Sequence, residues 1–158
     1  MAPASSSSRP SCHDPGRARR RQRLGLAFAA RVAWARVVKL VVEEPETRAL
    51  RRFVAQADPR TLVTSALSRA ELLRAAQRRD EPTVRKAREV LDGVAEITIT
   101  EGLLDSAGAI QPSTIRTLDA IHLATAMELG AELTVLVAYD ARLLAAARAA
   151  SVPIHTPV

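Results

Sequence analysis

Short apolar segments alternate with helical segments over most of this chain, and no other feature of the sequence constrains the fold as strongly. The clearest strand is residues 134–138 (TVLVA), an uninterrupted apolar run of the kind found in buried parallel sheets. The clearest helix, residues 118–129, ends before Gly130, a residue suited to the left-handed turn that follows a helix. Strands separated by helices form parallel sheets covered on both faces. The sequence therefore predicts an α/β protein with a three-layer α/β/α arrangement and a central parallel sheet.

The other elements are predicted from apolar periodicity and from breaks at proline and glycine. Strands are expected near residues 26–32, at 61–65 and at 95–98, with a last strand or tail from Ile154. Helices are expected at residues 37–43, 46–57, 68–79, 82–91, 101–109 and 140–150, of which the third and fourth would form a hairpin.

The positive charge of the chain is concentrated at its N-terminus. The formal net charge is +6, but residues 1–36 alone hold eight arginines and a single acid, Asp14. Subtracting these from the totals of 23 basic and 17 acidic residues leaves 15 and 16 for the rest of the chain. We expect residues 1–23, rich in serine, proline and arginine, to be a disordered basic extension and residues 24–158 to form the domain. The near-neutral domain argues neither for nor against nucleic acid.

Cysteine usage and hydropathy indicate a cytoplasmic protein. The single cysteine, Cys12, excludes a disulfide framework and fits a reducing compartment. No apolar run approaches the ~20 residues that a membrane span needs, so no membrane association is expected. An export signal over residues 24–35 is the alternative, and it is disfavoured because Arg31 interrupts the apolar run after seven residues.

Three acidic residues occupy equivalent places in the predicted fold. Glu71 follows the strand 61–65, Asp119 opens the clearest helix, and Asp140 follows the strand 134–138. The carboxyl ends of parallel strands share one edge of a sheet, so these side chains are expected to converge there. Two carboxylates ~4 Å apart at an effective dielectric constant of ~20 repel by about 4 kcal/mol, which a bound cation would offset. Oxygen ligands of this kind favour Mg²⁺ or Mn²⁺.

Each acid also has a purely structural explanation. Ser68 and Glu71 have the S-x-x-E spacing of a capping box, in which Glu71 only caps its own helix. A negative charge at Asp119 suits the positive end of the helix dipole. Asp140 could be the N-cap of the helix that follows it. The residues alone are therefore compatible with a divalent-metal site and do not establish one.

Four stretches resemble consecutive motifs of the PIN-domain ribonucleases of the VapC toxin type. They occur in the family's order, cover nearly all of residues 37–158, and are VVKLVVEEPET (37–47), TSALSRAELLRA (64–75), TLDAIHLATAMELG (117–130) and VAYDARLLAAARAASVPI (137–154). The resemblance implies a PIN-like fold. It also implies a metal-dependent endoribonuclease toxin of a type II toxin–antitoxin system, which uses Mg²⁺ or Mn²⁺ and is neutralised by a VapB-type antitoxin encoded beside it.

The resemblance also assigns site residues. Glu71, Asp119 and Asp140 match the family's second, third and fourth acidic positions, which implies catalytic and metal-binding roles, with Asp119 as a direct ligand. From their place at the same edge of the sheet, Thr64 and Ser65 could also bond to RNA phosphate, although polar residues are common at the ends of strands. A homodimer or a toxin–antitoxin hetero-oligomer is implied as well.

His122 lies one helical turn after Asp119, on the same face of the predicted helix. It could bind metal or phosphate. The preferred interpretation is a partly buried packing residue.

The chain departs from the family at the first acidic position, an aspartate at the end of the first strand. Counting back from residues 37–40 places that aspartate at Ala33, followed by Trp34, Ala35 and Arg36 in place of small and polar residues. The expected cluster therefore has three carboxylates instead of four. Either the nuclease site has decayed, or the stretch before Val37 is translated in the wrong frame.

Three functions follow from these observations. The first is an endoribonuclease toxin, and the second is a catalytically impaired PIN domain that binds antitoxin or RNA without cutting. Metal-dependent RNA cleavage separates these two. The third is a nucleic-acid-binding protein that works through Arg17–Arg23, and removal of residues 1–23 would abolish its salt-dependent binding.

Overall fold

The computed structural model describes residues 31–35, 37–42 and 45–158. The predicted basic extension and most of the first predicted strand lie outside these residues. Within them, five parallel strands form one sheet in the order β3-β2-β1-β4-β5. The strands are β1 (Arg31–Trp34), β2 (Leu62–Ser65), β3 (Ala95–Ile97), β4 (Leu133–Val137) and β5 (Ile154–His155).

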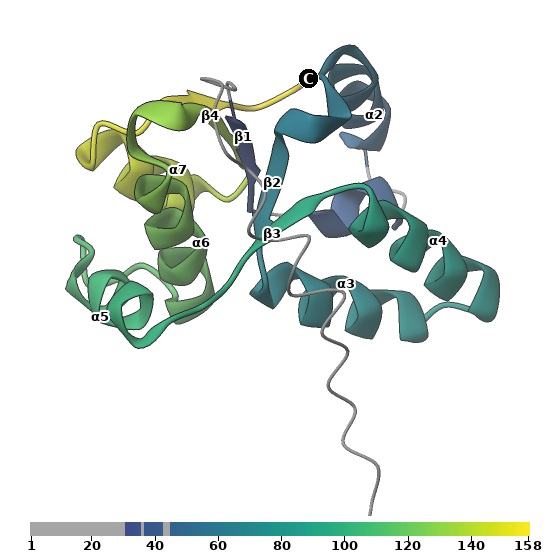
Figure 1. Ribbon diagram of the computed structural model, residues 1–158, viewed down its shortest axis with the longest axis horizontal. Helices are drawn as coiled ribbons and strands as arrows, with labels where there is room; N and C mark the ends of the chain where they lie inside the picture. Colours follow the sequence, from purple (N-terminus) through teal and green to yellow (C-terminus); the bar gives the residue numbers. More distant parts are fainter. Residues whose placement is uncertain (1–30, 36, 43–44) are drawn as a thin grey trace, which may run out of the picture.

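Helices cover both faces of the sheet. In Figure 1, α2, α3 and α4 lie on one side of the strands, and α5, α6 and α7 lie on the other. The α-helices are α2 (Thr47–Gln56), α3 (Leu67–Gln77), α4 (Glu81–Asp92), α5 (Glu101–Ala109), α6 (Thr117–Glu128) and α7 (Ala141–Ala149). Short 3₁₀ helices are η1 (Val37–Leu40), η2 (Pro59–Thr61) and η3 (Gly130–Glu132). The predicted α/β class and three-layer arrangement are confirmed.

The central strand β1 contributes to both hydrophobic cores. Trp34 pairs with Thr64 of β2 and with Val137 of β4. Successive side chains of a strand point to opposite faces. Accordingly, Trp34 packs in an apolar cluster with residues of η1, α2, α3 and α4, whereas Ala33 and Ala35 pack in a second cluster with residues of α6 and α7. The two faces of β1 are thus equally buried.

Two predicted elements differ from the structure. The helix expected at residues 37–43 is the 3₁₀ turn η1, because two consecutive valines disfavour a helix and the buried Val37 and Leu40 are three residues apart, the repeat of a 3₁₀ helix. The strand expected near residues 26–32 is described only from Arg31 and extends to Trp34. Gly130 has φ of +51° after the end of α6, as its sequence position predicts. None of the described helices is long and apolar enough to cross a membrane.

Candidate acidic site at the start of helix α6

Helix α6 places Asp119 at the carboxyl edge of the sheet. Every residue of this helix from Asp119 to Ala126 is buried. The helix contacts β1, β2 and β4 as well as α5 and α7. Asp119 is only 4% exposed, in the first turn. A carboxyl group at such a position needs polar or cationic neighbours to offset its desolvation.

Glu71 is joined to the same helix through a histidine. The Oε2 atom of Glu71 lies 2.9 Å from Nε2 of His122, which is one turn after Asp119. The His122 side chain is 2% exposed and that of Glu71 is 30% exposed. Among the described residues, Nδ1 of His122 has no hydrogen-bond partner. The pair fixes one carboxylate oxygen of Glu71 and leaves the rest of that side chain partly accessible.

The capping box predicted for Ser68 and Glu71 is not formed. Helix α3 begins at Leu67, and its N-cap residue Ala66 makes no side-chain cap. The hydroxyl of Ser68 is instead hydrogen-bonded to the hydroxyl of Thr64, 2.6 Å away. Glu71 is therefore held by a tertiary contact with α6 and not by its own helix.

Asp140 is the N-cap of α7. Its Oδ1 atom accepts hydrogen bonds from the backbone N–H groups of Arg142 (2.9 Å) and Leu143 (3.2 Å). Its Oδ2 atom is 4.0 Å from Nη1 of Arg116, the residue at the N-cap position of α6. The structural explanation for Asp140 is therefore confirmed, and this residue also approaches the start of α6.

The start of α6 is the common neighbour of the three predicted site residues. Arg116, Asp119 and His122 are spaced by three residues and so share one side of the helix. Glu71 reaches this side through His122, and Asp140 reaches it through Arg116. Within the part of the chain that the structure describes, however, no three His, Cys, Asp or Glu side chains are arranged to hold a metal ion. Among the described side chains the ligand set is therefore incomplete, and the Mg²⁺ or Mn²⁺ site that the resemblance implies stays a prediction.

The described part of strand β1 adds no acidic side chain to this ligand set. Ala33, the position at which the resemblance places the family's first acid, is 3% exposed and pairs with Val63 and Leu136. Trp34 is equally buried, and its indole N–H has no hydrogen-bond partner among the described residues. Such an unsatisfied donor costs about 1–3 kcal/mol. Strand β1 therefore fills its place with apolar atoms and supplies no ligand.

Thr64 and Ser65, the residues predicted to contact RNA, are each 1% exposed. The Thr64 hydroxyl donates to the carbonyl oxygen of Trp34 (2.9 Å), and Ser65 Oγ accepts from the backbone N–H of Leu67 (3.2 Å). These bonds hold β1, β2 and the start of α3 together. A role in RNA contact stays a prediction.

The segment beside Asp140 is anchored to the C-terminus. The hydroxyl of Tyr139 donates to the carbonyl oxygen of Pro157 (3.2 Å), and the ammonium of Lys39 lies 4.7 Å from the centre of the tyrosine ring. Burial raises the pKa of Tyr139 above its ordinary value of 10.0, although Lys39 opposes this. Tyr139 therefore stays neutral and acts as a packing residue.

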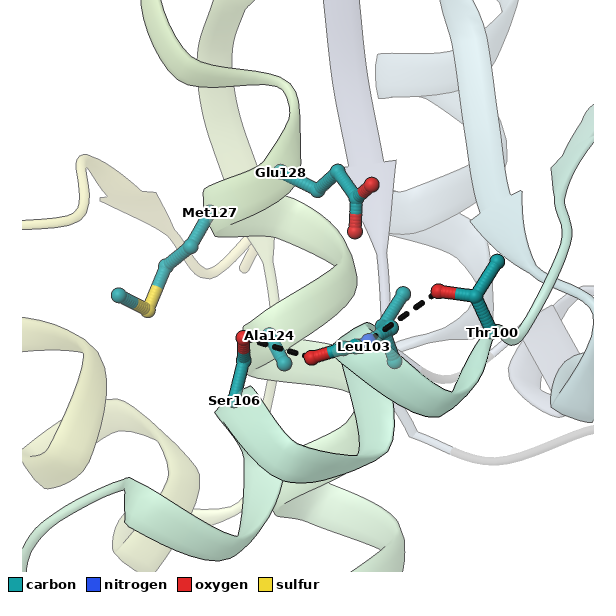
Figure 2. Close-up of a pocket in the computed structure, with 7 residues that line it drawn as sticks. Thr100, Leu103, Ser106, Ala124, Met127 and Glu128 are labelled. Atoms are coloured by element: carbon teal, nitrogen blue, oxygen red, sulfur yellow. Dashed lines mark hydrogen bonds between the residues drawn. The ribbon is translucent and has the colours of Figure 1, made fainter.

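A pocket of about 350 Å³ lies between α5 and α6, beyond the acidic residues (Figure 2). Its polar groups serve α5 itself, since Thr100 caps the helix at the N–H of Leu103 (3.1 Å) and Ser106 donates to the carbonyl oxygen of Gly102 (2.9 Å). Glu128 is the single ionisable residue of its lining. The pocket does not combine the groups that a reaction would need.

Comparison with known proteins agrees with this fold. The PIN domain family model matches residues 36–149, so the chain belongs to the PIN-domain family. The match starts at residue 36, after β1.

Within that family the chain is of the VapC type. It is 42% identical over 121 residues to Ribonuclease VapC46 of Mycobacterium tuberculosis (strain ATCC 25618 / H37Rv). The aligned residues make up 77% of this chain and 92% of the relative. It is 41% identical over 115 residues to Ribonuclease VapC47 of M. tuberculosis (strain CDC 1551 / Oshkosh), covering 71% and 85%. Ribonuclease VapC35 of the same species is 37% identical over 123 residues, covering 77% and 91%. The predicted family is confirmed.

Two features of the site were not predicted. No local pattern indicates the Glu71–His122 pair, because its members are 51 residues apart. Arg116 does carry a sign, since it lies three residues before Asp119 and so on the same side of the helix. A search for basic residues at this spacing would have found it.

Proposed function

We propose that this chain is the toxin of a type II toxin–antitoxin system and belongs by descent to the metal-dependent endoribonucleases. Its substrate would be the phosphodiester bonds of cytoplasmic RNA, and a cognate VapB-type antitoxin would neutralise it. The names of the relatives support this proposal. The observation that carries it is the gathering of Glu71, Asp119 and Asp140 around the start of α6.

The residues of this site can bind an RNA backbone in a defined way. Arg116 is 59% exposed and offers a guanidinium group to a phosphate beside Asp140. His122 holds Glu71 in one orientation, which places a partly exposed carboxylate on the other side of Asp119. A phosphate at the start of α6 would also gain from the positive end of the helix dipole.

Mg²⁺, with Mn²⁺ as a substitute, is the ion that we propose for the family's acidic positions in this chain. Asp119 would be the first ligand, and Glu71 and Asp140 would complete or hydrate the ion. Because Ala33 removes one anionic ligand and the described acids form no three-ligand group, we expect weak metal binding and weak cleavage.

A catalytically impaired PIN domain is the second candidate, and a specific observation favours it. Ala33 lies in an apolar cluster with Leu123 and Leu136, so nothing in the described part of β1 replaces the missing acid. Such a domain would still bind antitoxin or RNA. Mg²⁺-dependent cleavage of RNA by the purified chain would exclude this candidate.

The antitoxin is tested by co-expression. A tagged copy of this chain should co-purify with the VapB-type protein encoded beside its gene. The matched control is an Asp119→Asn variant, which changes the nuclease site alone. If the complex does not depend on the acidic residues, this variant should co-purify with the antitoxin as well as the parent chain does. A soluble partner that never elutes with the tagged chain would contradict the toxin–antitoxin role.

A further inference from the structure

Helix α3 carries arginines along the side that faces the acidic site. The helix starts beside the sheet and runs outward along α4, which it contacts over its length (Figure 1). Its first turns place Glu71 against His122 of α6. Arg74 and Arg78 come three and seven residues after Glu71, so they lie on the same side of the helix. At 1.5 Å per residue they are roughly 5 and 10 Å further along its axis.

The charges of these two arginines are exposed and uncompensated. Both side chains lie on the surface, and among the described residues neither forms an ion pair. The neighbouring exposed residues Ala70 and Gln77 carry no charge. Like charges four residues apart on a helix repel each other, although positive charges in the last turn and at the C-cap also suit the negative end of the helix dipole. An anion bound to both guanidinium groups would remove the repulsion.

The acidic site needs such a positive surface to hold its substrate. The acids at the start of α6 repel an RNA backbone, and the chain from residue 37 onward has no excess of basic residues to attract one. Attraction to this site is therefore expected from cations placed near it, in addition to the arginines of residues 1–36. Arginine suits this purpose because its planar guanidinium can donate two parallel hydrogen bonds to one phosphate.

We propose that Arg74 and Arg78 bind consecutive phosphate groups of single-stranded RNA and lead the strand along α3 to the acidic site at Glu71. This inference rests on the proposed function, because it takes RNA as the substrate. It assigns two substrate-positioning residues outside the family's acidic motifs. The cations act on binding and not on the hydrolytic step.

Helix α4 offers a matched control. Arg85 and Arg88 are exposed, lie three residues apart, and belong to the same helical hairpin, but they are on the neighbouring helix. The double variants R74A/R78A and R85A/R88A therefore remove the same charge from similar helical positions. A third variant, R74K/R78K, retains the charge and removes the fork of donors.

Binding is measured with a fluorescein-labelled single-stranded RNA by anisotropy, in EDTA so that no cleavage occurs, at several salt concentrations. R74A/R78A should weaken binding roughly tenfold and lower the slope of log Kd against log salt by about 1.4, the value for two phosphate contacts on a single strand. R85A/R88A should bind like the parent chain, and R74K/R78K should keep most of the slope. Melting curves of all variants verify that they fold.

Several results would overturn the inference. Equal losses in the two alanine pairs would mean that net charge alone matters, and unchanged binding in R74A/R78A would remove these residues from the RNA surface. A parent chain without measurable RNA binding, or a variant that loses antitoxin instead of RNA, would count equally against it. If R74A/R78A loses RNA binding while neither the parent chain nor Ala33→Asp cleaves RNA in Mg²⁺, the inference stands and the nuclease proposal falls. If RNA is cleaved in Mg²⁺ but R74A/R78A binds RNA as tightly as the parent chain, the nuclease proposal stands and the inference falls.

Discussion

Ala33 stands at the position where the resemblance places the family's first acid. Its side chain lies on the face of β1 that α6 and α7 cover, and it contributes to the apolar cluster there. The strand pairs with β2 and β4 through backbone hydrogen bonds, which do not depend on the side chain. The fold therefore does not require a carboxylate at this position.

Replacement of Ala33 by aspartate should make the protein sensitive to metal. Without a divalent ion, Ala33→Asp should lower the Tm, because the new carboxylate is desolvated among apolar side chains. Millimolar Mg²⁺ should recover part of the loss, since an ion that binds only the folded state stabilises it. Circular dichroism melts with Mg²⁺ and with EDTA measure both effects.

Ala33→Asn is the control for this experiment, because it has nearly the shape of aspartate without the charge. It should lower the Tm and show no response to Mg²⁺. Equal stabilisation of the parent chain and of both variants by Mg²⁺ would mean that the ion binds elsewhere.

The individual roles of the site residues were only partly predictable. Asp140 could be recognised as a helix cap because a cap depends on residues within one turn. Glu71 fitted the same kind of local rule, but the capping box considered as its alternative role is not formed, because its partner His122 comes from another helix. Local patterns name the residue types of this site, whereas tertiary contacts decide what each side chain does.

Elements with clear boundary signals were predicted best. Helix α4 follows Asp80, which caps it, and α6 ends before Gly130 with its positive φ. Strand β1 and the 3₁₀ turn η1 were predicted least well. Strand β1 lies within the apolar stretch 24–35 and η1 follows it, and this stretch has no proline or glycine near its end to mark a boundary. The bounds of an element were therefore predicted best where a capping or helix-breaking residue marks its end.

The cap of α4 should make this hairpin sensitive to acid. Oδ1 of Asp80 accepts a hydrogen bond of 2.7 Å from the N–H of Thr83. That bond, together with Arg85 and Arg79 nearby, lowers the pKa of Asp80 below its ordinary value of 3.8. A lowered folded-state pKa contributes stability above the unfolded-state value and loses it as the pH falls through the folded-state value.

The matched variant is Asp80→Asn, because asparagine also caps helices and does not titrate. Between about pH 5 and pH 2 the Tm of the parent chain should therefore fall further than that of Asp80→Asn. The two Tm curves, measured side by side by circular dichroism, decide the matter. Parallel curves would mean that other carboxyl groups account for the acid sensitivity.

At the scale of the whole molecule, charged residues from distant parts of the sequence meet at the start of α6. Glu71 contacts His122, Asp140 approaches Arg116, and Asp119 lies in the first turn of this helix. The parallel sheet is the reason that residues so distant in sequence share an edge. Convergence at that edge could be predicted from the alternation of strands and helices. The absence of a complete metal site from the described residues could be inferred only by comparing strand one with the family.

Activity is the property of the whole molecule that this arrangement should limit most. The chain as it stands should cut RNA weakly or not at all, because phosphodiester cleavage depends on exact placement of the reacting groups. Loss of a contact worth ~3–4 kcal/mol to the transition state slows a reaction by roughly 10²–10³-fold. Ala33→Asp should recover cleavage in Mg²⁺, and growth inhibition without antitoxin should return with it. The substitution is made alone, because Trp34 packs in the core and its removal would leave a cavity.

Three chains decide this prediction: the parent, Ala33→Asp, and Ala33→Asp combined with Asp119→Asn. Initial rates on a labelled RNA should rise from the parent to the single variant and fall again in the double variant. That order attributes the recovered activity to the acidic site, because Asp119→Asn removes a charge there with little change in shape. If the parent already cuts as fast as Ala33→Asp, position 33 does not correspond to the family's first acid, and another acid must complete the site.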